Sequence, residues 1–309
     1  MPKLKIAILG IGAVGGYFGG LLAKKYKESN EAEIIFIARG ENGEVIKKNG
    51  LKLITPSGEF TCFSDRVSTN AEEIGKVDVL ICAMKSYHLE SALIPYKNCI
   101  TPETLILPLL NGVDAKERIQ KILPGTQVLD GCVYIVSRLT SPGVITETGN
   151  IHSLYFGSSD VSKEKLNSLL QVFVNAGIDA HQPQNIQKVI WEKYFFISTI
   201  ASLTSFLDKP IGAILESEKD VALLKELFRE LKMITAAKGI ELAPDIAEKT
   251  LERLRKLPYE TTSSMHSDLK KGNPTEYVSL TEYVMKLGRE LNVLTPIYDK
   301  ILNVLSKTK

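Results

Sequence analysis

A glycine-rich segment near the N-terminus constrains the fold of this chain more than any other feature. Six of the eleven residues at positions 10–20 are glycines, and they directly follow a short apolar run at positions 6–9. Gly10, Gly12 and Gly15 have the spacing G-x-G-x-x-G. In a strand–turn–helix unit these glycines permit a tight turn, close approach of the backbone to a pyrophosphate, and close packing of helix on sheet. The segment therefore predicts a dinucleotide-binding fold.

The same segment also has features of a signal peptide or a membrane helix. Residues 6–23 carry no charge and follow Lys3 and Lys5, as the start of a secreted or membrane protein would. Each glycine, however, disfavours a helix by about 1 kcal/mol relative to alanine, and no second long apolar stretch appears in the chain. We therefore expect a cytoplasmic protein without a membrane segment.

The composition is that of an ordinary globular protein with two domains. The chain has 309 residues, of which 44% are hydrophobic and 24% charged, and its formal net charge is +2, which gives no indication of nucleic-acid binding. Four cysteines and four histidines lack the spacing of metal ligands, so we expect no metal site. The four cysteines are expected as buried free thiols.

The first half of the chain alternates short apolar runs with helix-like stretches, a pattern typical of a parallel α/β sheet. Two hairpins are expected within this series, at 51–63 and, around Gly149 and Asn150, at 144–156. The expected sheet strands are Lys5–Leu9, Glu33–Ala38, Val77–Ala83, Thr104–Leu109 and Gln127–Ile135.

The second half contains amphipathic helices and no strand-like runs. The sequence thus predicts a Rossmann-type doubly wound domain over residues 1–183 and a helical substrate domain over residues 184–309, with a reaction cleft between them. The expected helices are Asn185–Leu207, Glu218–Lys238, Ala243–Lys256, Thr275–Glu290 and one that begins at Pro296.

The end of the second strand favours NADP(H) over NAD(H). Dinucleotide-binding domains that use NAD place a carboxylate there, on the ribose 2′-hydroxyl. Here the strand ends at Arg39, whose guanidinium can neutralise a 2′-phosphate and stack on adenine. Ala13 and Val14, at the start of the first helix, would present N–H groups to the pyrophosphate. Glu41 lies close enough to keep NAD as the alternative.

Two further strands end in polar residues that can contact a cofactor or substrate, because ligands bind beyond the carboxyl ends of such strands. Lys85 follows the strand near residue 80, and Asn111 follows the strand near residue 107. Each has a purely structural alternative. Lys85 can be a solvated loop lysine, and Asn111-Gly112 is a good turn dipeptide.

Lys193 is the candidate acid of the second half. It lies early in an apolar helix, with Ile197 and Ala201 following on the same face. Its ammonium can protonate a carbonyl oxygen that gains charge during hydride transfer. The alternative is a lysine whose stem packs while its charged end reaches water.

Glu276 and Ser264 are ambiguous from the residues alone. Asn273, Pro274 and Glu276 fit the N-cap, N1 and N3 positions of a capping box, which would give Glu276 a structural role. Ser264, with Ser263 before it, can provide a hydroxyl to a carboxylate or cap a short helix.

Taken together, these features resemble the ketopantoate reductase (2-dehydropantoate 2-reductase) family over nearly the whole chain. The resemblance is carried by the glycine-rich N-terminus, Arg39, Lys85, Leu110-Asn111-Gly112, Trp191-x-Lys193, Ser263-Ser264-Met265-x-x-Asp268 and Thr275-Glu276. It implies reduction of a 2-oxo acid by NADPH in pantothenate biosynthesis, and a second domain like that of 6-phosphogluconate dehydrogenase.

The resemblance also implies residue roles. Gly10, Gly12 and Gly15 would hold the pyrophosphate and Arg39 the 2′-phosphate, while Lys85 and Asn111 would line the nicotinamide side. Lys193 would donate the proton, Glu276 would hydrogen-bond the reacting oxygen or a substrate hydroxyl, and Ser264 would bind the substrate carboxylate. The sequence does not determine the oligomeric state, and a homodimer is one alternative.

One departure from the family pattern affects substrate identity. The family often has asparagines four and eight residues after the catalytic lysine, where this chain has Ile197 and Ala201. We expect Ser198 and Ser202 to bind substrate in their place, although they lie about 100° further round the helix. A reductase of another 2-oxo acid, and a nucleotide-binding regulatory protein without turnover, therefore remain as alternatives.

Overall fold

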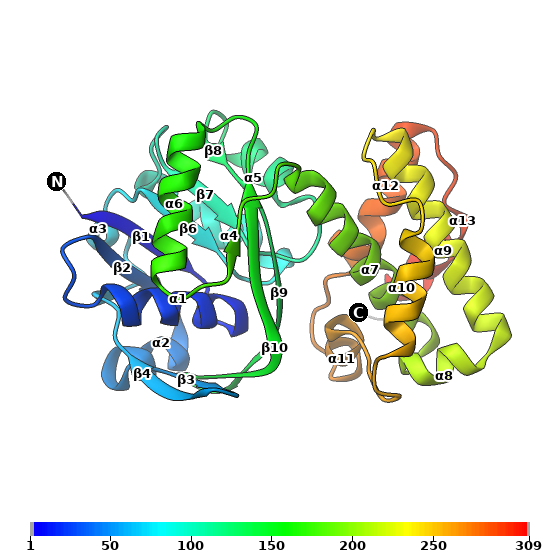
Figure 1. Ribbon diagram of the computed structural model, residues 1–309, viewed down its shortest axis with the longest axis horizontal. Helices are drawn as coiled ribbons and strands as arrows, with labels where there is room; N and C mark the ends of the chain where they lie inside the picture. Colours follow the sequence, from blue (N-terminus) through cyan, green and yellow to red (C-terminus); the bar gives the residue numbers. More distant parts are fainter. Residues whose placement is uncertain (1–2, 308–309) are drawn as a thin grey trace. The chain divides into compact units, whose positions relative to one another are not determined.

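The computed structural model describes residues 3–307 and divides the chain into two compact units (Figure 1). The first unit comprises Met1–Leu110 and Ala115–Ile186, and the second comprises Asn111–Asp114 and Gln187–Lys309. The division after residue 186 lies three residues beyond the one we predicted. We did not predict that the short segment Asn111–Asp114 groups with the helical unit.

A six-stranded parallel sheet forms the centre of the first unit. Alternate residues of its strands contribute to different apolar clusters: Ile8 and Phe36 belong to one, and Leu9 and Ile37 to the other. Burial on both faces explains why these strands are continuous apolar runs in the sequence. The strands, in spatial order, are β5 (Arg66–Val67), β2 (Ala32–Ile37), β1 (Leu4–Leu9), β6 (Val79–Cys82), β7 (Leu105–Pro108) and β8 (Gln127–Val128).

Helices connect these strands, as the α/β pattern predicts. The first of them, α1, packs its glycine-rich face closely: a Cβ at Gly16 or Gly20 would meet Ile145 or Leu53. The helical elements of this unit are α1 (Ala13–Tyr26), α2 (Gly40–Asn49), α3 (Ala71–Ile74), η1 (Ser86–His88), α4 (Leu89–Leu93), η2 (Ile94–Cys99), α5 (Ala115–Ile122) and α6 (Lys163–Asn175).

A second sheet packs on the glycine-rich face of α1, and here one expectation was wrong. We predicted a hairpin around Gly149, but a single long strand crosses that region, and its antiparallel partner is the preceding strand. The turn lies at Gly143, and residue 149 falls in an irregularity of the ladder between Glu147 and His152. The strands are β3 (Leu51–Thr55), β4 (Gly58–Cys62), β9 (Asp130–Ser141), β10 (Val144–Gly157) and β11 (Ala180–His181).

The second unit is helical and has its own apolar core. Its elements match four of the five expected helices closely, whereas the expected helix at 275–290 starts later and opens with a π-helical turn. Among residues 3–307, no helix is both long and apolar enough to cross a membrane. The elements are α7 (Ile186–Leu207), α8 (Ile211–Glu216), α9 (Glu218–Ala237), α10 (Ile246–Arg255), α11 (Ser264–Lys270), η3 (Val278–Glu282), α12 (Tyr283–Leu291) and α13 (Pro296–Leu305).

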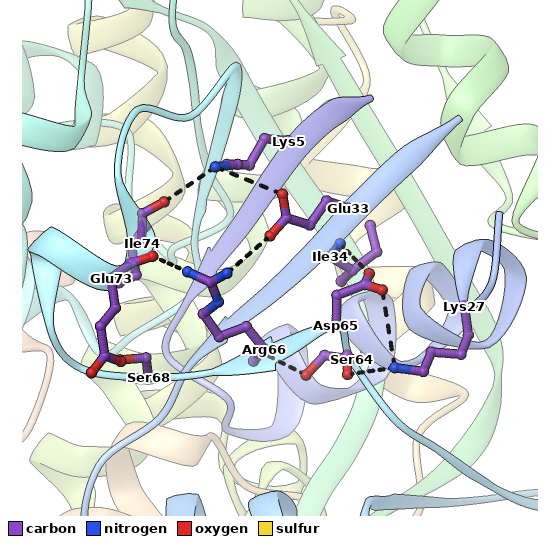
Figure 2. A network of polar contacts seen from close by, with 10 residues as sticks. All are labelled: Lys5, Lys27, Glu33, Ile34, Ser64, Asp65, Arg66, Ser68, Glu73 and Ile74. Carbon is purple, nitrogen blue, oxygen red and sulfur yellow. Dashed lines mark hydrogen bonds and ion pairs between the residues drawn. The ribbon is translucent and has the colours of Figure 1, made fainter. Parts of the chain in front are cut away.

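A polar network secures the edge strand β5 of the parallel sheet (Figure 2). Arg66 forms an ion pair with Glu33 of β2 at 3.8 Å and donates to the carbonyl oxygen of Glu73, while Ser68 donates to the Glu73 carboxylate at 2.6 Å. Exposed pairs of this kind contribute little individually. Together they fix the segment after β5, which leads to Thr69 at a pocket described below.

Candidate active site

The glycine-rich loop between β1 and α1 has the geometry that we predicted from its spacing. Gly10 has φ 97°, and a Cβ there would lie 3.1 Å from the backbone of Ala83 and Met84. A Cβ at Gly15 would lie 2.0 Å from the Gly10 carbonyl oxygen. The protein itself therefore requires glycine at both positions.

Gly12 differs, because a Cβ there would meet no heavy atom of the described chain within 4 Å. It is the N-cap of α1, and no side chain caps this end of the helix. Ala13 and Val14 form the first turn, where N–H groups lack intrahelical acceptors. Open space beside free N–H groups at a helix start fits a phosphate.

A pocket of about 410 Å³ adjoins this loop, within the size range of ligand sites. Arg39 is exposed at its rim, where it is the N-cap of α2. Both apolar and polar residues line the pocket. Its lining residues include Gly10, Gly12, Ala38, Arg39, Asn42, Thr69, Ser91 and Tyr96.

Several of these lining residues were absent from our predictions, among them Asn42, Thr69 and Tyr96. Asn42 donates to the Ile11 carbonyl oxygen at 2.7 Å and accepts from the Gly143 N–H at 2.8 Å, so it ties the glycine-rich loop to the β9–β10 turn. Tyr96 donates to the Thr69 carbonyl oxygen at 3.2 Å. They lie far apart in the sequence, and no motif marks them.

Lys85 lies immediately after Met84, which lines the pocket, and is the N-cap of η1. It is half-buried and makes polar contacts. Next to it, the Ser86 carbonyl oxygen accepts from Arg118 at 2.7 Å, and Arg118 is bidentate to Glu90. The loop that carries Lys85 is thus held in place from α5.

In the second unit, a hydrogen-bonded cluster joins three of the predicted site residues. The Asn111 amide accepts from the Lys193 ammonium through Oδ1 at 3.2 Å and donates to the Glu276 carboxylate through Nδ2 at 3.3 Å. Lys193 is 9% exposed and Glu276 3%. A cation, an amide and a carboxylate are therefore desolvated side by side, which strengthens their interactions with any polar group brought to them.

Glu276 is not part of a capping box. Its backbone carbonyl accepts from Leu280 N at 3.0 Å and η3 begins at Val278, so the helix starts after Glu276. The N–H of Asn273, which a capping box would pair with Glu276, instead donates to the Asp268 carbonyl oxygen at 2.9 Å. The structural alternative for Glu276 is therefore wrong, and its carboxylate faces Asn111.

Asp114 anchors the segment that carries Asn111 to the π-helical turn. Its carboxylate accepts from the Ser279 hydroxyl at 3.0 Å, and the Ser279 carbonyl oxygen accepts from the Tyr194 hydroxyl at 2.8 Å. Burial, followed by the nearby Tyr298 and Asp114, raises the pKa of Tyr194 well above its ordinary value, so its hydroxyl stays neutral and donates. Single-turn π segments often occur at functional sites.

Ser198 and Ser202 do not join this cluster. The Ser198 hydroxyl donates to the Leu280 carbonyl oxygen at 2.6 Å and bonds the Tyr298 hydroxyl, and the Ser202 hydroxyl bonds Thr281 at 2.8 Å. Both serines are fully buried. Their hydroxyls are used in packing α7 against η3 and α13, so we correct our expectation that they bind substrate.

Ser264 is exposed as the first residue of α11. Ser263 caps this helix by accepting from His266 N at 3.0 Å, and its hydroxyl also bonds Thr204 of α7 at 2.9 Å. The hydroxyl of Ser264 is therefore available to a ligand at a well-fixed position.

The four cysteines, Cys62, Cys82, Cys99 and Cys132, are buried thiols that form no disulfide bond. Burial raises the pKa of Cys82 to about 12, which leaves it protonated and unreactive. No group of three or more potential metal ligands occurs in residues 3–307.

Comparison with protein families identifies the family to which this two-unit chain belongs. The family model for ketopantoate reductase PanE/ApbA matches residues 6–160, and the model for the C-terminal part of the same family matches residues 185–309. The chain belongs to the ketopantoate reductase family. It is therefore an oxidoreductase of the pyridine-nucleotide-dependent type, and its Rossmann-type and helical units are those of the family fold.

Individual relatives agree with this assignment. The crystal structure of 2-dehydropantoate 2-reductase from Porphyromonas gingivalis W83 is 33% identical, with a TM-score of 0.85 and coverage of 99% of this chain and 100% of that one. The 2-dehydropantoate 2-reductase of Mesorhizobium japonicum is 28% identical, covering 97% of this chain and 96% of its own. An uncharacterized oxidoreductase of Bacillus subtilis, YkpB, is 29% identical, with 96% of each chain covered.

Proposed function

We propose that this protein reduces 2-dehydropantoate (ketopantoate) to pantoate with NADPH, a step of pantothenate biosynthesis in the cytoplasm. The observation that carries the proposal is the desolvated cluster of Lys193, Asn111 and Glu276. It provides a proton donor and its hydrogen-bonding partners at one place in the helical unit. The family relatives named 2-dehydropantoate 2-reductase support the substrate.

The glycine-rich loop and its pocket would hold the dinucleotide. Gly10, Gly12 and Gly15 would shape the pyrophosphate site, with the N–H groups of Ala13 and Val14 directed to the phosphate. Arg39 would pair with the 2′-phosphate, and Lys85 and Asn111 would border the nicotinamide. When bound, the reduced nicotinamide supplies the hydride that is added to the ketone carbon.

Lys193 would act on the ketone oxygen. As the hydride reaches carbon, this oxygen gains negative charge, and the ammonium stabilises it and then transfers a proton, which yields the alcohol. Glu276 would hydrogen-bond the new hydroxyl or a substrate hydroxyl and offset the lysine charge. Asn111 holds both groups through its two amide atoms.

A second candidate is the reduction of a 2-oxo acid with an apolar side chain. Ile197 and Ala201 follow Lys193 on one face of α7, and neither can hydrogen-bond a substrate hydroxyl. Each lost hydrogen bond to such a hydroxyl costs about 0.5–1.5 kcal/mol of binding. A branched, unhydroxylated chain would instead gain contact with Ile197.

A substrate panel separates these candidates. Purified protein is assayed by NADPH and NADH oxidation with ketopantoate, 2-oxoisovalerate, 2-oxoisocaproate and phenylglyoxylate. Preference for ketopantoate supports the first candidate, and preference for an unhydroxylated acid supports the second. Tight NADPH binding without oxidation by any acid contradicts both and indicates a regulatory protein. Light scattering of the same sample tests whether the chain is a homodimer.

A further inference from the structure

A buried histidine links the C-terminal end of α7 to the loop that precedes α11. His266 is 2% exposed, and its Nε2 lies 2.7 Å from Oδ1 of Asp208, the residue that follows α7. Its Nδ1 bonds the hydroxyl of Thr262, two residues before Ser264. Both ring nitrogens of His266 therefore form hydrogen bonds, Nε2 with Asp208 and Nδ1 with Thr262.

The hydrogen-bond roles follow from the chemistry of the partners. The neighbouring His266 and Lys270 lower the pKa of Asp208, so its carboxylate is ionised and can only accept. Nε2 of His266 therefore carries the hydrogen. The Thr262 hydroxyl can donate to Nδ1 or accept from it, and so completes the link in either case.

A second link runs parallel to the first. Thr204 lies in the last turn of α7, four residues before Asp208, and its hydroxyl bonds that of Ser263 at 2.9 Å. Residues 262 and 263 are thus tied to the same end of α7 through separate side chains. Ser264 follows them directly, with its own side chain exposed.

We propose that His266 is a positioning residue for the substrate carboxylate. With Asp208 and Thr262 it sets the backbone of residues 262–264 relative to α7, which also carries Lys193. The Ser264 hydroxyl is then held at a fixed separation from the proton donor, so that a 2-oxo acid can engage both. This inference rests on the proposed function and on the role that the family resemblance implies for Ser264, which is to bind the substrate carboxylate.

The role predicts a specific kinetic signature. If residues 262–264 are held less firmly, the Ser264 hydroxyl binds the substrate carboxylate more weakly, whereas Lys193 and its hydrogen-bond partners are unaffected. KM for the 2-oxo acid should therefore rise by about five- to tenfold, equivalent to roughly one neutral hydrogen bond. The kcat at saturation and the affinity for NADPH should change little.

The two hydrogen-bond partners of His266, Asp208 and Thr262, are exposed, so we expect variants at these positions to fold. Asp208→Ala and Thr262→Ala each remove one partner of His266 at an exposed residue, whereas Asp208→Asn and Thr262→Ser keep an acceptor or a hydroxyl. We expect the alanine variants to raise KM for the panel's preferred 2-oxo acid, and the conservative variants to stay near wild type. His266→Leu, which removes both bonds, should raise KM at least as much.

Lys270→Met is the matched control. It removes the ion pair to Asp208 at 3.2 Å from an exposed site without touching His266, so KM should not change. Unchanged KM in Asp208→Ala and Thr262→Ala, with or without a lower melting temperature, contradicts the positioning role alone. Absence of turnover in the wild-type protein with every 2-oxo acid contradicts the proposed function, and this inference with it.

Discussion

The Asp114 carboxylate accepts a hydrogen bond from the Ser279 hydroxyl at 3.0 Å, and both side chains are buried. This bond joins the four-residue segment that starts at Asn111 to the π-helical turn that follows Glu276. The contact between Asp114 and Ser279 therefore helps to hold Asn111 and Glu276, two residues of the proposed site, next to each other.

Ser279→Ala should lower both stability and turnover. It removes one partner of a buried carboxylate, which costs about 1–3 kcal/mol, and it frees the segment that presents Asn111 to Lys193. Urea unfolding and steady-state kinetics measure the two effects. An unchanged unfolding midpoint would mean that other partners of Asp114 are sufficient, and would contradict this anchoring.

Lys193→Ala should lower kcat by about 10²–10⁴-fold, the usual contribution of a general acid. NADPH affinity, measured by fluorescence titration, should be almost unchanged, because the lysine lies in the helical unit and the glycine-rich loop in the other. Lys193→Arg serves as a control that keeps the charge but is a poor acid at neutral pH. Full activity in Lys193→Ala would show that Lys193 is not the general acid.

The four central strands of the parallel sheet, β2, β1, β6 and β7, could be predicted closely because they are buried and leave continuous apolar runs. The short edge strand β5 was missed, and the strand expected at 127–135 is divided between β8 and β9, which belong to different sheets. The β9–β10 hairpin could not be predicted. Gly149 and Asn150 have the composition of a turn, yet the ladder passes this point with an irregularity and turns at Gly143 instead. Local composition does not distinguish a bulge from a turn, because the partner strand decides between them.

The candidate site was predictable as separate residues and not as an arrangement. Lys193 is conspicuous as a charge in an apolar helix, and Asn111 as the polar end of a strand. Their bond spans 82 positions, and that between Asn111 and Glu276 spans 165. Ser198 failed as a candidate because a 100° rotation round α7 places it in the core.

Gly12→Ala should weaken NADPH binding without destabilising the fold. The added methyl group meets no protein atom within 4 Å, but it occupies the space where the pyrophosphate would approach. Gly15→Ala is the matched comparison, since its methyl group would lie 2.0 Å from the Gly10 carbonyl oxygen and should lower the melting temperature. If Gly12→Ala and wild type bound NADPH equally well, the pyrophosphate of NADPH would not bind next to Gly12.

Arg39→Ala should weaken NADPH far more than NADH. The guanidinium is exposed at the pocket rim, where it can pair with a 2′-phosphate that only NADPH carries. The measurement is kcat/KM for the two cofactors, at low and at high salt, because a charge pair at an exposed site is screened. Equal losses for both cofactors would refute the 2′-phosphate assignment and favour a role for Glu41 with NAD.

Glu230 should make the protein less stable as the pH rises. Its fully buried carboxylate accepts from the N–H groups of Ile297 and Tyr298 at 2.8 and 3.1 Å, but burial outweighs these bonds and raises its pKa above the ordinary 4.5. Between that value and the raised one, the folded state holds a proton that the unfolded state has released, so the free energy of unfolding falls with increasing pH.

Carboxylates with lowered pKa, such as Glu90 beside Arg118, act in the opposite direction, so the contribution of Glu230 has to be isolated by substitution. Glu230→Gln keeps one acceptor oxygen and removes the titration. Urea unfolding of both proteins between pH 4 and 8 should show the variant gaining stability relative to wild type as the pH rises through this window. A constant difference across the range would mean that Glu230 titrates normally in the folded protein.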